Sequence, residues 1–130
     1  AKAVWDILMN FEDYPRWNPF IKKISGDLQL GSQIEVSIQP PNSNMMTFKP
    51  KILEYEPLKK LRWIGKTFIP KIFDGEHSLI IQEITGDKVL FIQKEQFTGI
   101  FVPIVSGLLN HTNQGFELMN QALKVEAEKN

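Results

Sequence analysis

The chain has 130 residues, with 15 basic and 15 acidic side chains and a formal net charge of zero. This length suits a single domain, 1–130, with a substantial core, and the balanced charge argues against a nucleic-acid-binding domain. The absence of Cys excludes a disulfide framework and thiolate chemistry, and two His residues are too few for a His-rich metal site, so that no metal or other cofactor is expected.

The N-terminal segment predicts a helix followed by a shorter helix. Four apolar residues at i, i+3, i+4 and i+7 form one helical face, namely Val4, Ile7, Leu8 and Phe11. This helix is expected to stop near Asn10. Pro15 is expected to begin a second helix, which ends at Asn18-Pro19.

The start of the chain carries Asp6 and lacks a small-residue cleavage site, so it does not resemble a signal peptide. No apolar run reaches the roughly 18–20 residues of a membrane span, and we expect a cytoplasmic protein.

The segment from residue 20 to residue 97 changes to a period of two, which is typical of antiparallel strands with one solvated face. Loop-forming breaks divide it into six strands of a meander, at residues 27–31, 40–44, 56–59, 70–75 and 85–88. The apolar face of the sheet is expected to carry Phe48, Ile52, Leu61, Trp63, Leu79 and Phe91.

The last third of the chain returns to the helical period. One apolar stripe consists of Val105, Leu108, Leu109, Thr112, Phe116, Met119 and Leu123. We expect a continuous helix from about Val102 to beyond Leu123, unbroken at Gly107, with this stripe facing the sheet. The order helix, short helix, six strands and long helix predicts an α+β fold, in which only the long helix is large enough to cover the apolar face of the sheet.

Three polar residues fall on the apolar face of the last two strands, where an unpaired polar group would be costly: His77, Gln93 and Glu95. A three-residue loop at Thr85–Asp87 would set His77 opposite Glu95, and a five-residue loop would set His77 opposite Phe97. A two-residue turn would change the face unless a bulge restored it. A His–Glu pair in an apolar cavity could act as an acid/base couple. We favour a buried polar bridge or a ligand-orienting pair without chemistry.

Short motifs follow one another along nearly the whole chain in a characteristic order: Val4-Trp5-Asp6-Ile7-Leu8, Tyr14-Pro15-Arg16-Trp17-Asn18-Pro19-Phe20, Leu61-Arg62-Trp63, Asp74-Gly75-Glu76-His77, Glu95-x-Phe97-x-Gly99 and Gly115-Phe116-Glu117-x-Met119-Asn120. In this order they resemble the SRPBCC superfamily, also called START-like or birch-pollen-allergen-like, and in particular its polyketide-cyclase/dehydrase-type branch. The resemblance implies a helix grip, in which a curved antiparallel sheet wraps around a long C-terminal helix and leaves a hydrophobic cavity between the two. Family members have a strand before the first helix, whereas only residues 1–3 precede it here, so we expect that strand to be missing upstream.

The resemblance also implies a function, because members of the superfamily bind lipids, sterols, polyketides or other apolar molecules. We expect a non-catalytic protein, a monomer or homodimer, that binds a small hydrophobic molecule between the long helix and the sheet. The alternative is a cyclase or dehydratase acting on an apolar substrate in the same cavity, with Glu95 or His77 as the acid/base. A third hypothesis is an interaction module whose own side chains fill the cavity. The expected ligand-binding residues are Trp17, Phe20, Trp63, Phe73, His77, Phe91, Gln93, Glu95, Leu108, Leu109, Thr112 and Phe116.

Overall fold

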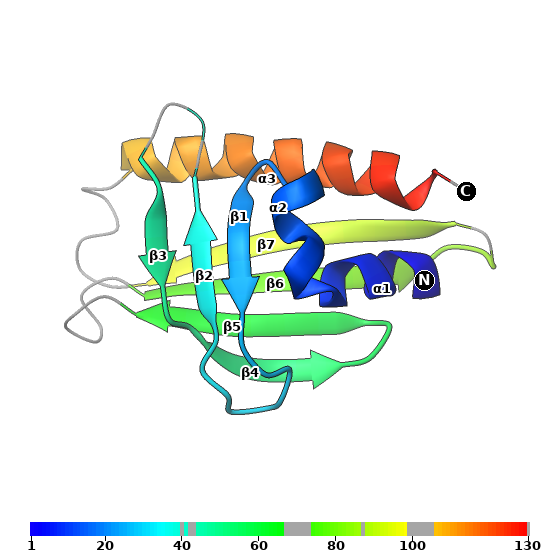
Figure 1. Cartoon of the computed structure of the whole chain (residues 1–130), viewed down its shortest axis with the longest axis horizontal. Coiled ribbons are helices and arrows are strands. Elements are labelled where there is room, and N and C mark those ends of the chain that lie inside the picture. The colour runs from blue at the N-terminus through cyan, green and yellow to red at the C-terminus, as the bar shows by residue number, and fades with distance from the viewer. Residues whose placement is uncertain (40, 42–43, 67–73, 87, 99–105, 130) are drawn as a thin grey trace.

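Short N-terminal helices, a series of antiparallel strands and a long C-terminal helix make up the fold (Figure 1). The computed structural model describes residues 1–39, 41, 44–66, 74–86, 88–98 and 106–129. The elements are α1 (Lys2–Met9), the 3-10 helix η1 (Phe11–Asp13), α2 (Tyr14–Trp17), β1 (Ile21–Ser25), β2 (Glu35–Ile38), β3 (Met46–Phe48), β4 (Lys51–Glu56), β5 (Lys60–Lys66), β6 (Asp74–Glu83), β7 (Val89–Thr98) and α3 (Ser106–Ala127). The expected α+β class is confirmed.

The strands form two antiparallel sheets, one in the order β1-β2-β3 and the other in the order β4-β5-β6-β7. In Figure 1 the strands of the first sheet run across those of the second, and α3 runs along β7. Backbone hydrogen bonds join the sheets at one corner, where the Ile34 N–H donates to Pro50 O and the Ile52 N–H to Ser32 O, both at 2.9 Å. The two sheets are therefore linked at this corner by backbone hydrogen bonds.

The expected division into six strands is wrong at one point, because the strand predicted around residues 46–55 is two strands. The break falls at Lys49-Pro50, between β3 in the first sheet and β4 in the second. Proline has no N–H to give to a strand ladder, and the buried Pro50 uses its carbonyl to accept from Ile34 instead. Phe48 ends the three-residue edge strand β3, and it is 37% exposed rather than part of the apolar wall.

The register of β6 against β7 is the one that a three-residue loop predicts. Ile81 pairs with Phe91, and His77 pairs with Glu95. The turn is closed by the Ile84 N–H, which donates to Lys88 O at 3.0 Å. Because this register keeps the period of two intact, His77 and Glu95 extend from the same face of the sheet.

The core lies between α3, the N-terminal helices and the two sheets, and within it α3 presents Phe116, Met119 and Leu123. This part of the predicted stripe faces inward, as expected. α3 runs unbroken from Ser106 to Ala127, with Gly107 in its first turn. The predicted start of the helix near Val102, and Val105, lie outside the described residues, as do the side chains of Leu108, Leu109 and Thr112.

The N-terminal helices are fixed to the rest of the fold by directional contacts. The Tyr14 hydroxyl, which is fully buried, donates to Leu8 O at 2.7 Å, and burial raises its pKa far above the ordinary value, so that the phenol stays neutral. Arg16 of α2 forms ion pairs with Asp13 and with Glu126 of α3. These hydrogen bonds from the guanidinium lower the pKa of both carboxyl groups. The short helix α2 is thereby attached to the C-terminal half of α3.

Candidate functional site

A buried acid/base pair lies on the inner face of the four-stranded sheet. His77 Nδ1 lies 2.6 Å from Glu95 Oε2, and the two side chains are 6% and 16% exposed. The two atoms are within hydrogen-bond distance, and which of them donates depends on the tautomer of the imidazole. This contact orients the imidazole and leaves its other nitrogen, Nε2, for a different partner.

Aromatic rings enclose the imidazole on two sides. Trp63, directly opposite His77 on β5, stacks on it with ring centroids 5.0 Å apart and planes inclined by 12°. Phe116 of α3 meets the imidazole edge-on at 5.0 Å, and Phe20 meets Phe116 edge-on at 5.4 Å. Within the described part of the chain, His77 Nε2 is buried and has no hydrogen-bond partner. A buried nitrogen in this state is open to a hydrogen bond from a bound molecule.

A second polar contact joins the sheet to the long helix. The Gln93 side chain donates from Nε2 to Asn120 Oδ1 at 2.7 Å and lies 3.4 Å from Phe116 O. Gln93 Oε1 is buried and accepts no hydrogen bond from the described residues. The polar residues that the alternation places inward thus form two groups under α3, His77–Glu95 and Gln93–Asn120, each with one unused buried atom.

Two further buried donors lie where α2 leads into β1. Asn18 Oδ1 accepts from the backbone N–H groups of Phe20 and Ile21, both at 2.9 Å, and so fixes the turn after α2. Asn18 Nδ2 and Trp17 Nε1 are buried without an acceptor among the residues described. Trp17 therefore has a polar atom that a ligand could satisfy, as well as an apolar ring.

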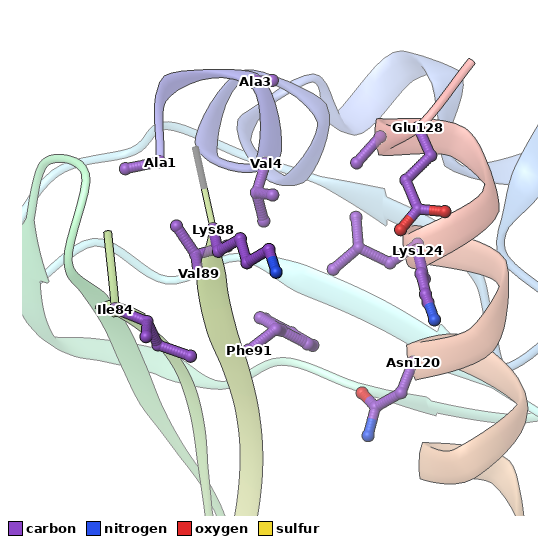
Figure 2. A pocket seen from close by; sticks show the side chains of 12 residues that line it. Ala1, Ala3, Val4, Ile84, Lys88, Val89, Phe91, Asn120, Lys124 and Glu128 are labelled. Atoms are coloured by element: carbon purple, nitrogen blue, oxygen red, sulfur yellow. The ribbon is translucent and has the colours of Figure 1, made fainter. Parts of the chain in front are cut away.

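A pocket of about 530 Å³ opens between α1, the β6–β7 turn, β7 and the C-terminal half of α3 (Figure 2). Its lining consists of Ala1, Ala3, Val4, Ile84, Lys88, Val89, Phe91, Asn120, Leu123, Lys124, Ala127 and Glu128. Asn120 belongs both to this lining and to the Gln93–Asn120 contact. The pocket therefore adjoins the Gln93–Asn120 group under α3.

The predicted ligand-binding residues do not gather at one site among the described residues. Phe91 lines the described pocket. Several others are buried together in the core or at its polar groups, namely Trp17, Phe20, Trp63, His77 and Phe116. Gln93 and Glu95 are partly buried. Phe73 lies outside the described residues, and so do the side chains of Leu108, Leu109 and Thr112. Ligand binding by these residues stays a prediction.

The sequence interpretation did not identify most of the pocket lining. Asn120 carried a detectable signal, because it follows Phe116 by four residues and precedes Leu123 by three, which puts a polar side chain on the buried face of α3. Lys88 lies in a turn and shows no periodicity. Val4 and Lys124 come together only because α1 packs against α3, which a local pattern does not reveal.

Two general properties of the described residues bear on the class of site. No described helix is long and apolar enough to span a membrane. Within the same residues, no cluster of three or more His, Asp or Glu side chains is arranged to hold a metal ion.

Comparisons with known proteins place the chain by its fold. By sequence, no protein-family model and no curated protein matches it. By structure, it is similar to the di-domain ARO/CYC protein StfQ of the steffimycin biosynthetic pathway, with a TM-score of 0.74 and 10% identity over 98% of this chain. The match covers 47% of StfQ, so the chain spans less than half of that protein's length.

Two structures of about the same length as this chain are similar as well. Protein MLL2253 from Mesorhizobium loti matches with a TM-score of 0.63 and 16% identity, over 95% of this chain and 88% of its own. The protein of unknown function SA2116 from Staphylococcus aureus matches with a TM-score of 0.65 and 12% identity, over 98% and 85% of the two chains. Together with the two antiparallel sheets and the long C-terminal helix, these matches show that the chain has the helix-grip α+β fold that these structures share.

Proposed function

We propose that this protein binds a small hydrophobic molecule, a lipid, a polyketide or a similar compound, between α3 and the sheet. The observation that carries the proposal is the cavity of about 530 Å³ beside α3, a volume within the roughly 300–1,000 Å³ of small-molecule sites. A pocket of this volume favours ligand binding over the hypothesis of an interaction module whose interior is filled by its own side chains. The structural neighbour StfQ, a di-domain ARO/CYC protein of a biosynthetic pathway, supports a small-molecule site in this fold.

The buried polar atoms under α3 lie outside the lining of the described pocket, which adjoins them through Asn120. A ligand that extends from the pocket to reach them would be oriented by hydrogen bonds. His77 Nε2 and Gln93 Oε1 have no partners among the described residues, and a ligand hydroxyl could donate to either atom. Leaving a buried polar atom unsatisfied costs about 1–3 kcal/mol, so a ligand that satisfies one gains selectivity over an apolar molecule of the same shape.

A direct test is to fill the cavity and measure binding of a neutral apolar dye such as Nile red. Val4 is half-buried in the lining, and Val4→Phe is expected to weaken dye binding by about tenfold or more, equivalent to about 1.4 kcal/mol. Val125→Phe is the matched control, because Val125 is 62% exposed on α3 and outside the lining. Equal dye affinity in both variants would show that the dye binds elsewhere and would contradict the proposal.

The second candidate function is a cyclase or dehydratase that acts on an apolar substrate in the same cavity. The specific observation in its favour is the 2.6 Å contact between His77 Nδ1 and Glu95 Oε2 inside an aromatic enclosure, which lies under α3 and outside the lining of the described pocket. A carboxylate that orients an imidazole allows the free nitrogen of the ring to take up or deliver a proton.

The change Glu95→Gln distinguishes the two functions, because it keeps the shape of the side chain and removes its charge and transferable proton. For a binding protein, affinity for an apolar ligand should change by less than about tenfold. For an enzyme, turnover of a polyketide-type substrate should fall by roughly 10²–10⁴. We expect the first result, measured by dye titration in parallel with product analysis. A large loss of product with unchanged dye affinity would establish the second candidate instead.

A further inference from the structure

We propose that the cavity between α1, β7 and α3 is selective for molecules that carry an anionic group on an apolar body, and that Lys88 binds the anionic group. This inference rests on the proposed function and specifies the class of ligand. Carboxylate and phosphate groups share the required chemistry, and the experiment below separates them.

The walls of the cavity supply the apolar part of the site. Val4, Val89 and Phe91 are partly buried, and Leu123 is 2% exposed. Ile84 is 64% exposed at the β6–β7 turn and also belongs to the lining. When such an exposed apolar side chain covers the apolar surface of a ligand, the binding free energy becomes more favourable by about 25 cal/mol per Å² of surface buried.

The charges of the lining favour an anion. Its charged side chains are Lys88, Lys124 and Glu128, two cations and one anion, which give a net charge of +1. Figure 2 shows the Lys88 side chain extending from the turn toward α3, with its amino group between Val4 and Phe91. An ammonium group over an apolar floor offers a ligand both hydrogen-bond donors and charge.

Lys88 and Lys124, like other exposed lysines such as Lys94, differ from the three lysines that form ion pairs within the described residues. Lys2, Lys60 and Lys129 form ion pairs with Asp6, Glu54 and Glu126. Neither Lys88 nor Lys124 forms an ion pair with any residue that the structure describes, although Glu128 lines the same cavity. Their charge is therefore available to a bound molecule rather than used within the fold.

The experiment compares three amphiphiles with the same twelve-carbon chain, namely dodecanoate, dodecyl phosphate and neutral dodecanol. Each probe displaces Nile red from the wild-type protein and from three variants. Lys88→Met removes the proposed contact, and Glu128→Gln removes the opposing charge. Lys94→Met is the control, because Lys94 is an exposed lysine of β7 outside the lining.

Lys88→Met is expected to weaken binding of the anionic probes by about fivefold to tenfold, as for loss of a charge-assisted hydrogen bond at a partly exposed site. Dodecanol binding and the Lys94→Met control should not change, and Glu128→Gln should strengthen binding of the anions. Preference for dodecanoate over dodecyl phosphate, or the reverse, identifies the headgroup chemistry.

Two results would overturn the inference. One is dodecanol binding as tightly as the anionic probes with no effect of Lys88→Met, and the other is Nile red binding without displacement by any amphiphile. In both cases the proposed apolar site would stand. If Val4→Phe left Nile red binding unchanged, the proposed function would be contradicted as well. The failure of the inference and the failure of the proposed function therefore give different results.

Discussion

Replacing Trp63 by Ala is expected to lower the free energy of unfolding by about 3–5 kcal/mol, the usual cost of emptying the space of a core tryptophan. Trp63 is 5% exposed and stacks on His77. The substitution would therefore remove both apolar burial and one wall of the enclosure around the imidazole. Urea unfolding followed by circular dichroism measures the loss.

The same variant separates a packed core from a ligand-lined wall. If Trp63 contacts a ligand, the loss of stability should be smaller in the free protein, and Nile red should stabilise the variant much less than the wild type. Trp63→Phe is the matched control, because it keeps a stacking ring and should lose less stability than Trp63→Ala. Wild-type stability together with wild-type dye binding in Trp63→Ala would contradict both roles.

Replacing Gly115 by Ala should also destabilise the fold, although Ala is the better helix former by about 1 kcal/mol. A Cβ atom at Gly115 would clash with Cδ1 of Phe20 and would lie 2.6 Å from its Cε1. Phe20 is 2% exposed and packs edge-on against Phe116, so its ring has little room to move. Overpacking of this kind typically costs about 1–3 kcal/mol, which exceeds the gain in helix propensity.

Thermal unfolding of four variants tests this prediction, namely Gly115→Ala, Phe20→Leu, their combination and the control Gly86→Ala. Gly86→Ala is the control, since a Cβ atom there would meet nothing within 4 Å, and it should change stability by less than about 0.5 kcal/mol. The double change Gly115→Ala/Phe20→Leu should cost less than the two single changes added together, because the smaller side chain relieves the clash. Additive effects would show that Phe20 is not what limits the space beside Gly115.

Strand alternation and helical period predicted most of the fold because each depends on local spacing. Alternation placed His77 and Glu95 on one face, and the short turn at Ile84–Lys88 then set them opposite each other. The break at Pro50 was not predicted, because polar and apolar residues continue to alternate through Lys49 and Lys51. Only the missing N–H of Pro50 distinguishes that position.

The described pocket shares Phe91 with the predicted ligand-binding residues, and most of its lining was not predicted. The long helix over a one-faced sheet indicated a space between them, but the described pocket forms where α1 meets α3 and β7. Its lining brings Val4 within one site with Lys88 and Leu123, residues separated by most of the chain. Such a site depends on how helices dock on the sheet, and no periodicity of a single segment encodes it.

The amide contact between Gln93 and Asn120 fixes the position of α3 along its own axis. Burial of apolar surface is non-directional, so apolar contacts alone would tolerate several axial positions of the helix. A slide of one turn, about 5.4 Å, would bring Phe116 or Lys124 to the place of Asn120 and leave the Gln93 amide without its 2.7 Å partner. This pair of side chains, together with the Arg16–Glu126 ion pair and the close packing of Gly115 on Phe20, therefore sets where α3 lies along the sheet. Exchange of these contacts offers a route by which the same sheet and helix could come to enclose molecules of different size.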